Sequence, residues 1–168
     1  NRALQANYFE LYCQPIYRFI EDKQELDSYE ILLRLNVDNQ GELLPPGSFI
    51  PAAERYGIMA KIDRWVINKS LSHFSRLEQN GGAAAHLSIN LSATSLGDIQ
   101  LPNYIQHLLE KYKVSANSIC FEISESSAVR DLGVALKQIK LLKSLGCRIS
   151  LDNFGAGFSS FGHLKRLQ

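Results

Sequence analysis

The chain has 168 residues, of which 45% are hydrophobic and 21% are charged, and its formal net charge is +1 at pH 7. This composition is typical of a globular domain, and the near-neutral charge without long runs of one sign argues against a surface for a nucleic-acid polymer. No apolar run approaches the ~20 residues that span a bilayer and no secretory leader precedes Asn1, so we expect a cytoplasmic domain, either free or as the cytoplasmic part of a larger membrane-bound protein.

Hydrophobic periodicity predicts an alternation of strands and helices along the chain. In chain order, the predicted elements are strands at 9–17 and 28–35, helices at 48–56 and 63–78, a strand at 85–92, a helix at 101–113, a strand at 119–124, a helix at 127–145 and a strand at 148–152. Strands that alternate with helices indicate βα units and a mainly parallel sheet.

Local signals set the boundaries of the first elements. Pro15 places the first strand at an edge or a bend, and the polar residues 21–27 are expected to form a turn or loop. The Asn-, Gly- and Pro-rich residues 36–47 are expected to form another loop. Ser48 and Asp63 are each suited to cap the helix that follows them.

Three cysteines, Cys13, Cys120 and Cys147, lie within or next to apolar strand-like runs without Cys-x-x-Cys spacing. They are expected to be reduced core residues, and not part of a disulfide framework or a zinc site.

Polar side chains recur near the ends of four predicted strands, at Glu30, Asn90, Glu122 and Asp152. Strands that keep one polar side are expected where those sides converge at the mouth of a (β/α) barrel. Such a barrel usually needs about 250 residues, so the five predicted strands represent an incomplete barrel. The fold class is therefore α/β.

The four side chains supply three carboxylates and one amide oxygen, which suit the hard cations Mg²⁺ or Mn²⁺. An alternative is that each carboxylate pairs with a nearby base, such as Glu30 with Arg34. Arg34 is equally suited to a phosphate or to a salt bridge at the rim. The Asp152–Asn153 pair can also form an Asx-type turn without any ligand.

The order of the motifs resembles the EAL domain family of bacterial cyclic di-GMP phosphodiesterases, over about the first two-thirds of that domain. The matching segments are Tyr12-Cys13-Gln14-Pro15-Ile16, Tyr29-Glu30-Ile31-Leu32-Leu33-Arg34, residues 46–54, Ile62-Asp63-Arg64-Trp65-Val66, Ile89-Asn90-Leu91-Ser92, residues 121–126 and residues 151–160. The resemblance implies a TIM-like barrel of EAL type, with residues 1–168 as a domain that lacks the C-terminal part of the barrel.

The resemblance also implies a role for each matching residue. It implies two bound Mg²⁺ or Mn²⁺ ions. Their ligands are assigned to Glu30, Asn90, Glu122, Asp152 and Asn153, with Asn153 at the second ion. It assigns phosphate binding to Arg34, and nucleotide contacts to Gln14, Leu32 and Asp63. The resemblance implies four catalytic residues, Glu30, Glu122, Asp152 and Glu125. Of these, Glu125 resembles the glutamate that stabilises the loop after Asp152. That loop is linked in the family to dimerisation, so a homodimer is expected, and GGDEF or sensor domains in the same polypeptide are expected partners.

Three departures from the family pattern bear on activity. Ile31 stands where the signature has Ala, on the side of the strand that faces away from Glu30. Asn153 stands where a second Asp is usual, and an amide without charge should weaken the second ion's site. The Lys, Glu and Gln that occur later in the family's domain are absent from residues 1–168.

Two hypotheses follow, a two-metal phosphodiesterase that opens one phosphodiester and a catalytically degenerate cyclic di-GMP sensor. A different Mg²⁺-dependent barrel enzyme is disfavoured by the motif order.

Overall fold

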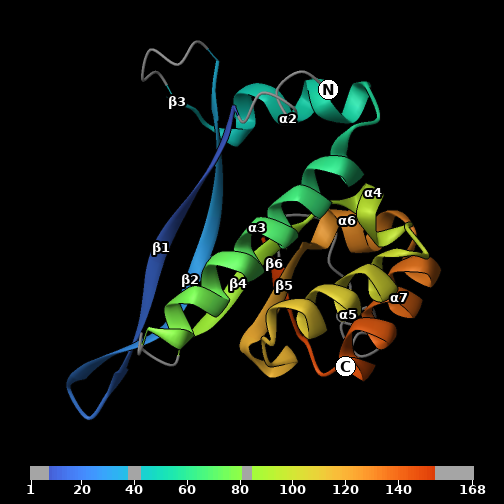
Figure 1. The fold of residues 1–168 in the computed structure, drawn as a ribbon. Coiled ribbons are helices and arrows are strands. Elements are labelled where there is room, and N and C mark those ends of the chain that lie inside the picture. The colour runs from blue at the N-terminus through green and yellow to red at the C-terminus, as the bar shows by residue number, and fades with distance from the viewer. Residues whose placement is uncertain (1–7, 38–42, 81–84, 154–168) are drawn as a thin grey trace.

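The computed structural model of this chain describes residues 8–37, 43–80 and 85–153. Its elements in chain order are β1 (Phe9–Ile20), β2 (Lys23–Asn36), β3 (Leu43–Leu44), α2 (Pro46–Arg55), α3 (Met59–Gln79), β4 (His86–Leu91), α4 (Ala93–Leu96), α5 (Leu101–Tyr112), the 3₁₀ turn η1 (Ala116–Ser118), β5 (Ile119–Ser124), α6 (Glu125–Arg130), α7 (Leu132–Ser144) and β6 (Arg148–Asp152) (Figure 1). Beyond Asn153, the loop expected after Asp152 lies outside the described residues.

The sheet has the strand order β1-β2-β4-β5-β6, and the two-residue strand β3 pairs with β2. β1 runs antiparallel to β2, whereas β2, β4, β5 and β6 are parallel to one another. All five predicted strands are confirmed, and β3 comes from a segment expected to be loop. Within the described ranges the sheet is open, with β1 and β6 at its edges, as expected for an incomplete TIM-like barrel.

The β1–β2 connection is shorter than predicted, because β2 begins at Lys23 and continues through residues expected to be a loop. Glu21 and Asp22 alone form the turn, with φ angles of 47° and 63°. Two successive positive φ angles are the mark of a type I′ turn, whose twist matches that of the paired strands. The turn lacks the Asn-Gly or Asp-Gly pair that usually signals it, and the expectation of a long loop was wrong for that reason.

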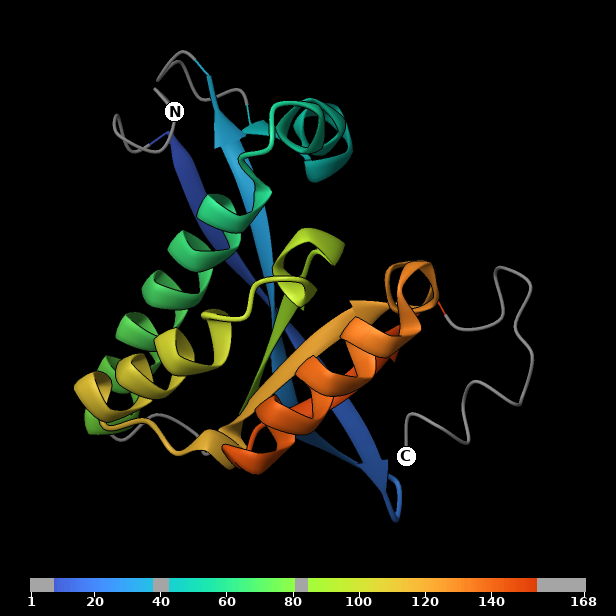
Figure 2. The same cartoon turned by 90° about the vertical axis from the view of Figure 1, so that its right-hand side faces the viewer.

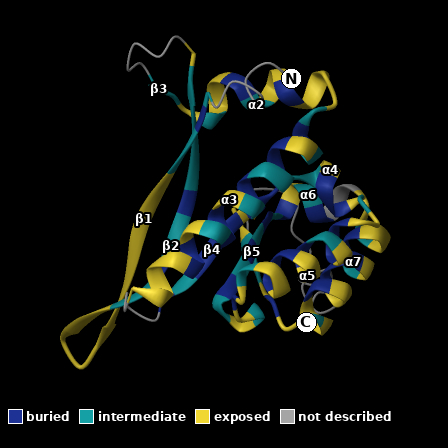
Figure 3. Ribbon diagram, viewed as in Figure 1, coloured by how far each residue is buried: buried dark blue, intermediate teal, exposed yellow. Residues whose placement is uncertain are grey.

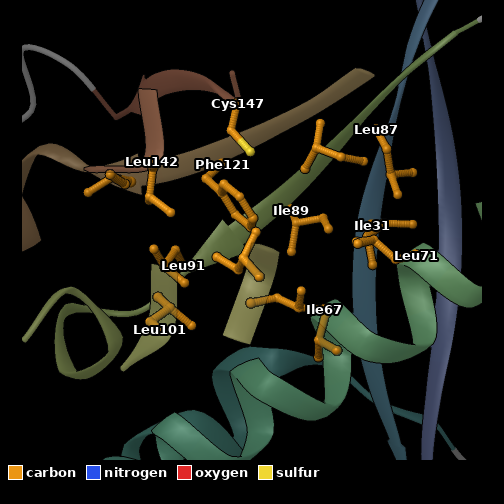
Figure 4. Close-up of a cluster of buried hydrophobic side chains, with 14 of the residues drawn as sticks. Ile31, Ile67, Leu71, Leu87, Ile89, Leu91, Leu101, Phe121, Leu142 and Cys147 are labelled. Atoms are coloured by element: carbon orange, nitrogen blue, oxygen red, sulfur yellow. The ribbon is translucent and has the colours of Figure 1, made fainter. Parts of the chain in front are cut away.

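Helices α3, α5 and α7 cover one face of the parallel strands (Figures 1 and 2). The core lies between them, and Figure 4 shows side chains from both layers packed together, among them Ile89 and Phe121 of the strands, Ile67 and Leu71 of α3, and Leu142 of α7. All five of these residues are fully buried, with 0% of their surface exposed. Replacing a fully buried aromatic such as Phe121 by Ala would cost about 3–5 kcal/mol of stability. The helix-facing side of the sheet is thus committed to packing.

Several helix boundaries differ from the sequence expectations. Helix α2 begins at Pro46 and not after Ser48, because proline is suited to the first turn of a helix, where its missing N–H is not needed. Helix α3 begins four residues before Asp63, so Asp63 is not its N-cap. The single helix predicted over 127–145 is two helices, since Asp131 breaks the run and its Oδ1 accepts a bond from the Val134 N–H at 3.1 Å.

Helix α3 is the longest in the described ranges, and no helix there is both long and apolar enough to cross a membrane.

Strand β1 is mostly exposed beyond its first residues, consistent with the edge position that Pro15 predicted (Figure 3). Cys13 lies on this strand and is exposed, so its assignment to the core was wrong. Cys147 is buried, and burial raises the pKa of its thiol to about 11. All three cysteines are free thiols.

Candidate functional site

The four predicted ligand positions lie on the face of the sheet opposite the helices. Ile31, Ile89, Phe121 and Ile123, which alternate with them along the strands, are buried in the core. Because side chains alternate across a strand, Glu30, Asn90, Glu122 and Asp152 all project from the other face. Ile31 therefore faces away from Glu30, as strand parity predicted.

The strand register places these positions on a slant across the sheet. Asn90 is directly opposite Glu122, whereas Glu30 is opposite Ser88, one step lower on the same face. Asp152 is opposite Ser124 and therefore one step higher than Glu122. A slant of this kind is what strand tilt in a barrel produces, because a line across the barrel mouth crosses successive strands at later residues.

Hydrogen bonds and charge repulsion link these side chains. The Asn90 Nδ2 donates to Glu30 Oε1 at 3.0 Å, across 60 residues of sequence. Burial raises the pKa of the Glu122 carboxyl, and the negative charges of Glu30 and Asp152 raise it further, while a hydrogen bond with Ser88 opposes them. The cluster therefore carries negative charge that its own residues do not neutralise.

Glu30, Glu122 and Asp152 form no ion pair with a base in the described part of the chain, so the alternative of carboxylate–base pairs at the site is not seen. The described ion pairs join Arg18 to Glu25 and Asp27, and Arg64 to Asp98. The Arg34 guanidinium instead donates from Nη1 to the Leu33 carbonyl at 2.9 Å and lies 6.0 Å from the centroid of the Tyr12 ring. Gln14 is opposite Glu30 on the edge strand β1, on the same face of the sheet.

The donor chemistry of this face fits a hard cation, since it offers three carboxylates and an amide with no basic partner among the described ion pairs. Among the described residues, however, no three carboxylate, imidazole or thiol side chains surround a common point. The fit is therefore one of ligand type and placement on neighbouring strands.

A cavity of about 500 Å³ opens beside the ends of β4, β5 and β6. The predicted site residues that line it are Leu32, Asp63, Asn90, Glu122, Asp152 and Asn153. Helices α2 and α3 add an apolar wall that includes Ile50 and Met59, together with the carboxylate of Glu54. The cavity thus combines an apolar side with an acidic side, the usual character of a small-molecule site. Sequence reasoning did not single out Glu54, which sits within a predicted helix and carries no distinguishing pattern.

Asp63 joins two elements at the edge of this cavity. It is 5% exposed, and its Oδ2 accepts hydrogen bonds from the Ser92 N–H at 3.0 Å, the Ser92 hydroxyl at 2.5 Å and the Ser95 hydroxyl at 2.6 Å. Burial raises the pKa of the Asp63 carboxyl, and these hydrogen bonds oppose the rise. Ser92 also caps α4, through the Ser95 N–H. The two serines could not be identified as partners of Asp63 from the sequence, because 29 residues or more separate them from it.

Asn153 follows β6 in the left-handed region, with φ of 55°. Its backbone N–H donates to Asp152 Oδ1 and its side-chain Nδ2 donates to Asp152 Oδ2, each at 2.8 Å. Glu125 begins α6 directly after β5 and is buried, with 9% of its surface exposed. The loop that Glu125 was expected to steady lies outside the described residues.

Comparison with known proteins places these features in a family. A sequence model described as EAL domain matches residues 1–168. The chain is 37% identical over 167 residues to the cyclic di-GMP phosphodiesterase PdeF of Escherichia coli, covering 99% of this chain and 21% of that protein. It is 30% identical to MucR of Pseudomonas aeruginosa, a bifunctional diguanylate cyclase/cyclic di-GMP phosphodiesterase, covering 99% of this chain and 24% of that protein.

Solved structures agree in fold. A complex of the PaMucR phosphodiesterase with c-di-GMP superposes with a TM-score of 0.88 at 31% identity, covering 99% of this chain and 66% of that one. The FimX EAL domain from Pseudomonas aeruginosa bound to c-di-GMP gives a TM-score of 0.86 at 32% identity, covering 99% and 65%. The chain therefore spans less than two-thirds of these solved chains and about a fifth to a quarter of the two curated relatives.

Proposed function

The chain belongs to the EAL domain family, and from this premise we propose that it forms the first part of a cyclic di-GMP phosphodiesterase domain whose barrel is completed by further residues. The observation that carries the proposal is the shared position of Glu30, Asn90, Glu122 and Asp152 on one face of the sheet, three of them beside the cavity. Support for the substrate comes from relatives whose names state cyclic di-GMP hydrolysis or binding.

In this proposal Glu30, Asn90, Glu122 and Asp152 hold Mg²⁺ or Mn²⁺, which supplies an activated water for opening one phosphodiester bond. The raised pKa of Glu122 favours that role, because a carboxyl crowded by Glu30 and Asp152 gains most from a neighbouring cation. Arg34 uses one nitrogen on the Leu33 carbonyl, and its remaining donors are suited to a phosphate. Leu32 lines the cavity and offers an apolar surface to a base, while Gln14 and Asp63 are proposed nucleotide contacts.

Asn153 favours a second candidate function, a cyclic di-GMP sensor that binds without hydrolysis. An amide at this position brings no negative charge to a second cation, and its nitrogen faces Asp152. A two-ion mechanism needs both cations to be held at once. The similar solved structures are a phosphodiesterase in complex with c-di-GMP and an EAL domain bound to c-di-GMP.

One experiment separates the two candidates. The full-length protein is incubated with cyclic di-GMP and Mn²⁺, the linear product is quantified by chromatography, and nucleotide affinity is measured calorimetrically. For a phosphodiesterase, we expect Asp152→Ala and Glu30→Ala to reduce turnover by at least about 100-fold, while nucleotide affinity changes less than about 10-fold. Hydrolysis that is equal with and without a chelator excludes the metal-dependent mechanism. Tight binding without product formation identifies a sensor.

Two further features belong to the proposal. A homodimer formed through the loop after Asp152 is proposed on the family resemblance, and its test is sedimentation of the full-length protein with and without cyclic di-GMP. Linkage to GGDEF or sensor domains is proposed because the chain covers only 21% of PdeF and 24% of the bifunctional MucR.

A further inference from the structure

Asn153 bonds to both oxygens of its neighbour Asp152, and this arrangement has a direct bearing on cation binding. The backbone N–H of Asn153 reaches Oδ1 and its side-chain Nδ2 reaches Oδ2, both at 2.8 Å. These distances are those of charge-assisted hydrogen bonds to an ionised carboxylate. The contact uses the amide nitrogen of Asn153, and not the amide oxygen that a cation would need.

The residue type at position 153 is suited to this contact in two ways. Its φ of 55° lies in the left-handed region, which Asn tolerates better than most residues other than glycine. Its amide also carries N–H donors, whereas an Asp side chain of the same shape has none when it is ionised. Asn is therefore one of few residues that can keep this backbone conformation and donate to Asp152.

We infer that Asn153 is a positioning residue that competes with a divalent cation for the Asp152 carboxylate, and is not itself a metal ligand. This inference rests on the proposed function, in which Asp152 takes part in cation binding. Two N–H groups direct their positive ends at the carboxylate, which lowers its attraction for a cation and occupies one lone pair on each oxygen. Full use of Oδ2 by a cation requires the side-chain bond from Asn153 to be released.

The sign of one measurement tests this inference. Mn²⁺ alone, without nucleotide, is titrated into the full-length protein by calorimetry, comparing the parent with Asn153→Gly. Glycine preserves the left-handed backbone and its N–H but deletes the side-chain donor. We expect Asn153→Gly to bind Mn²⁺ about 3- to 10-fold more tightly than the parent, because one competing hydrogen bond is lost. A ligand role or a purely structural role for Asn153 predicts weaker binding instead.

Two more variants complete the design. Asn153→Asp removes the donor and adds a charge beside Asp152, so it should tighten Mn²⁺ binding more than Asn153→Gly does. Asn117→Asp adds the same charge on the turn η1, which directly precedes β5 and so lies at the amino ends of the parallel strands, the end opposite Asp152; it should leave the affinity unchanged.

Unchanged or weaker Mn²⁺ binding in Asn153→Gly overturns the inference, and so does a failure of both parent and variant to bind Mn²⁺. An equal gain in Asn117→Asp and Asn153→Asp overturns its local electrostatic part. The proposed function is judged separately by product formation. If Asn153→Gly tightens Mn²⁺ binding but no variant hydrolyses cyclic di-GMP, the phosphodiesterase function is refuted. The competition between Asn153 and the cation for Asp152 is then still supported.

Discussion

Replacing Asp63 by Ala should destabilise the domain far more than the removal of one polar side chain from a helix usually does. The Asp63 carboxylate is the common acceptor for three donors from Ser92 and Ser95, at distances of 2.5 to 3.0 Å. Asp63→Ala leaves a backbone N–H and two hydroxyl groups without that acceptor, in a place where Ser95 is 1% exposed.

The size of the effect follows from two opposing contributions. Each donor left unsatisfied in a buried position costs about 1–3 kcal/mol, although hydroxyl groups can rotate toward other acceptors. Removing Asp63 also removes the cost of burying a carboxylate, which is reflected in its raised pKa. We therefore expect Asp63→Ala to lower the free energy of unfolding by about 2–4 kcal/mol, and Ser95→Ala to lower it by about 1–2 kcal/mol.

The assay is equilibrium unfolding of the full-length protein in urea, with Asp131→Ala as the matched control. Asp131 also accepts a backbone bond at a helix start, but it is exposed, so its loss should cost about 1 kcal/mol. A loss for Asp63→Ala no larger than that for Asp131→Ala would refute the argument that this buried network holds α3 against the β4–α4 junction.

The same carboxylate predicts a pH dependence whose sign can be worked out. Burial raises the pKa of Asp63 above its ordinary value of 3.8, so the folded chain holds this proton to higher pH than the unfolded chain does. The contribution of Asp63 is fully present below 3.8 and is lost as pH rises through the raised pKa. The stability of the parent relative to Asp63→Asn should therefore fall over that window as pH rises, and the difference should be flat near neutral pH.

Three other predictions concern the proposed cation site and the open sheet. Mg²⁺ or Mn²⁺ should support hydrolysis and Ca²⁺ should inhibit it, because Ca²⁺ prefers looser and larger coordination; equal rates with all three ions in a product assay would contradict this. Asn153→Asp should raise turnover at low Mn²⁺ while changing cyclic di-GMP affinity much less in metal-free buffer, and a parent that is already fast and indifferent to the change would show that an amide suffices. Residues 1–168 expressed alone should aggregate or swap with a second chain, because β6 is paired on one side only in the described sheet; a monodisperse monomer with a cooperative melting transition would refute this.

The strands and the shared face of the site could be predicted from the sequence because both depend on period-two alternation. Leu87, Ile89 and Leu91 alternate with Ser88 and Asn90, and this pattern alone separates the packed face from the polar face. The same rule placed Ile31 in the core, although the family signature has a smaller residue there.

The errors arose where a side chain has a distant partner or a turn has unusual chemistry. Asp63 has the appearance of a helix cap, but its partners lie 29 and 32 residues away, so α3 could begin earlier than expected. Asp131 is one residue in a long apolar-periodic run, and its capping bond divides that run into two helices. The early start of α3 is not visible in local propensity, because tertiary contacts decide between several acceptable local structures. The break at Asp131 is local, since its cap bond joins residues three apart, but the apolar period continues across it and obscures the signal.

The bond between Asn90 and Glu30 crosses 60 residues of sequence, and this distance has a kinetic consequence. Contacts of such separation close a long loop at an entropic cost, so a domain that depends on them folds more slowly than a helical bundle of similar size. Helices α3 and α5 can acquire helical structure early, whereas the slanted row of polar side chains exists only once β2, β4, β5 and β6 are aligned in register. Affinity for Mn²⁺ at the proposed site should consequently appear in the last phase of refolding, well after most of the helical circular dichroism signal has returned.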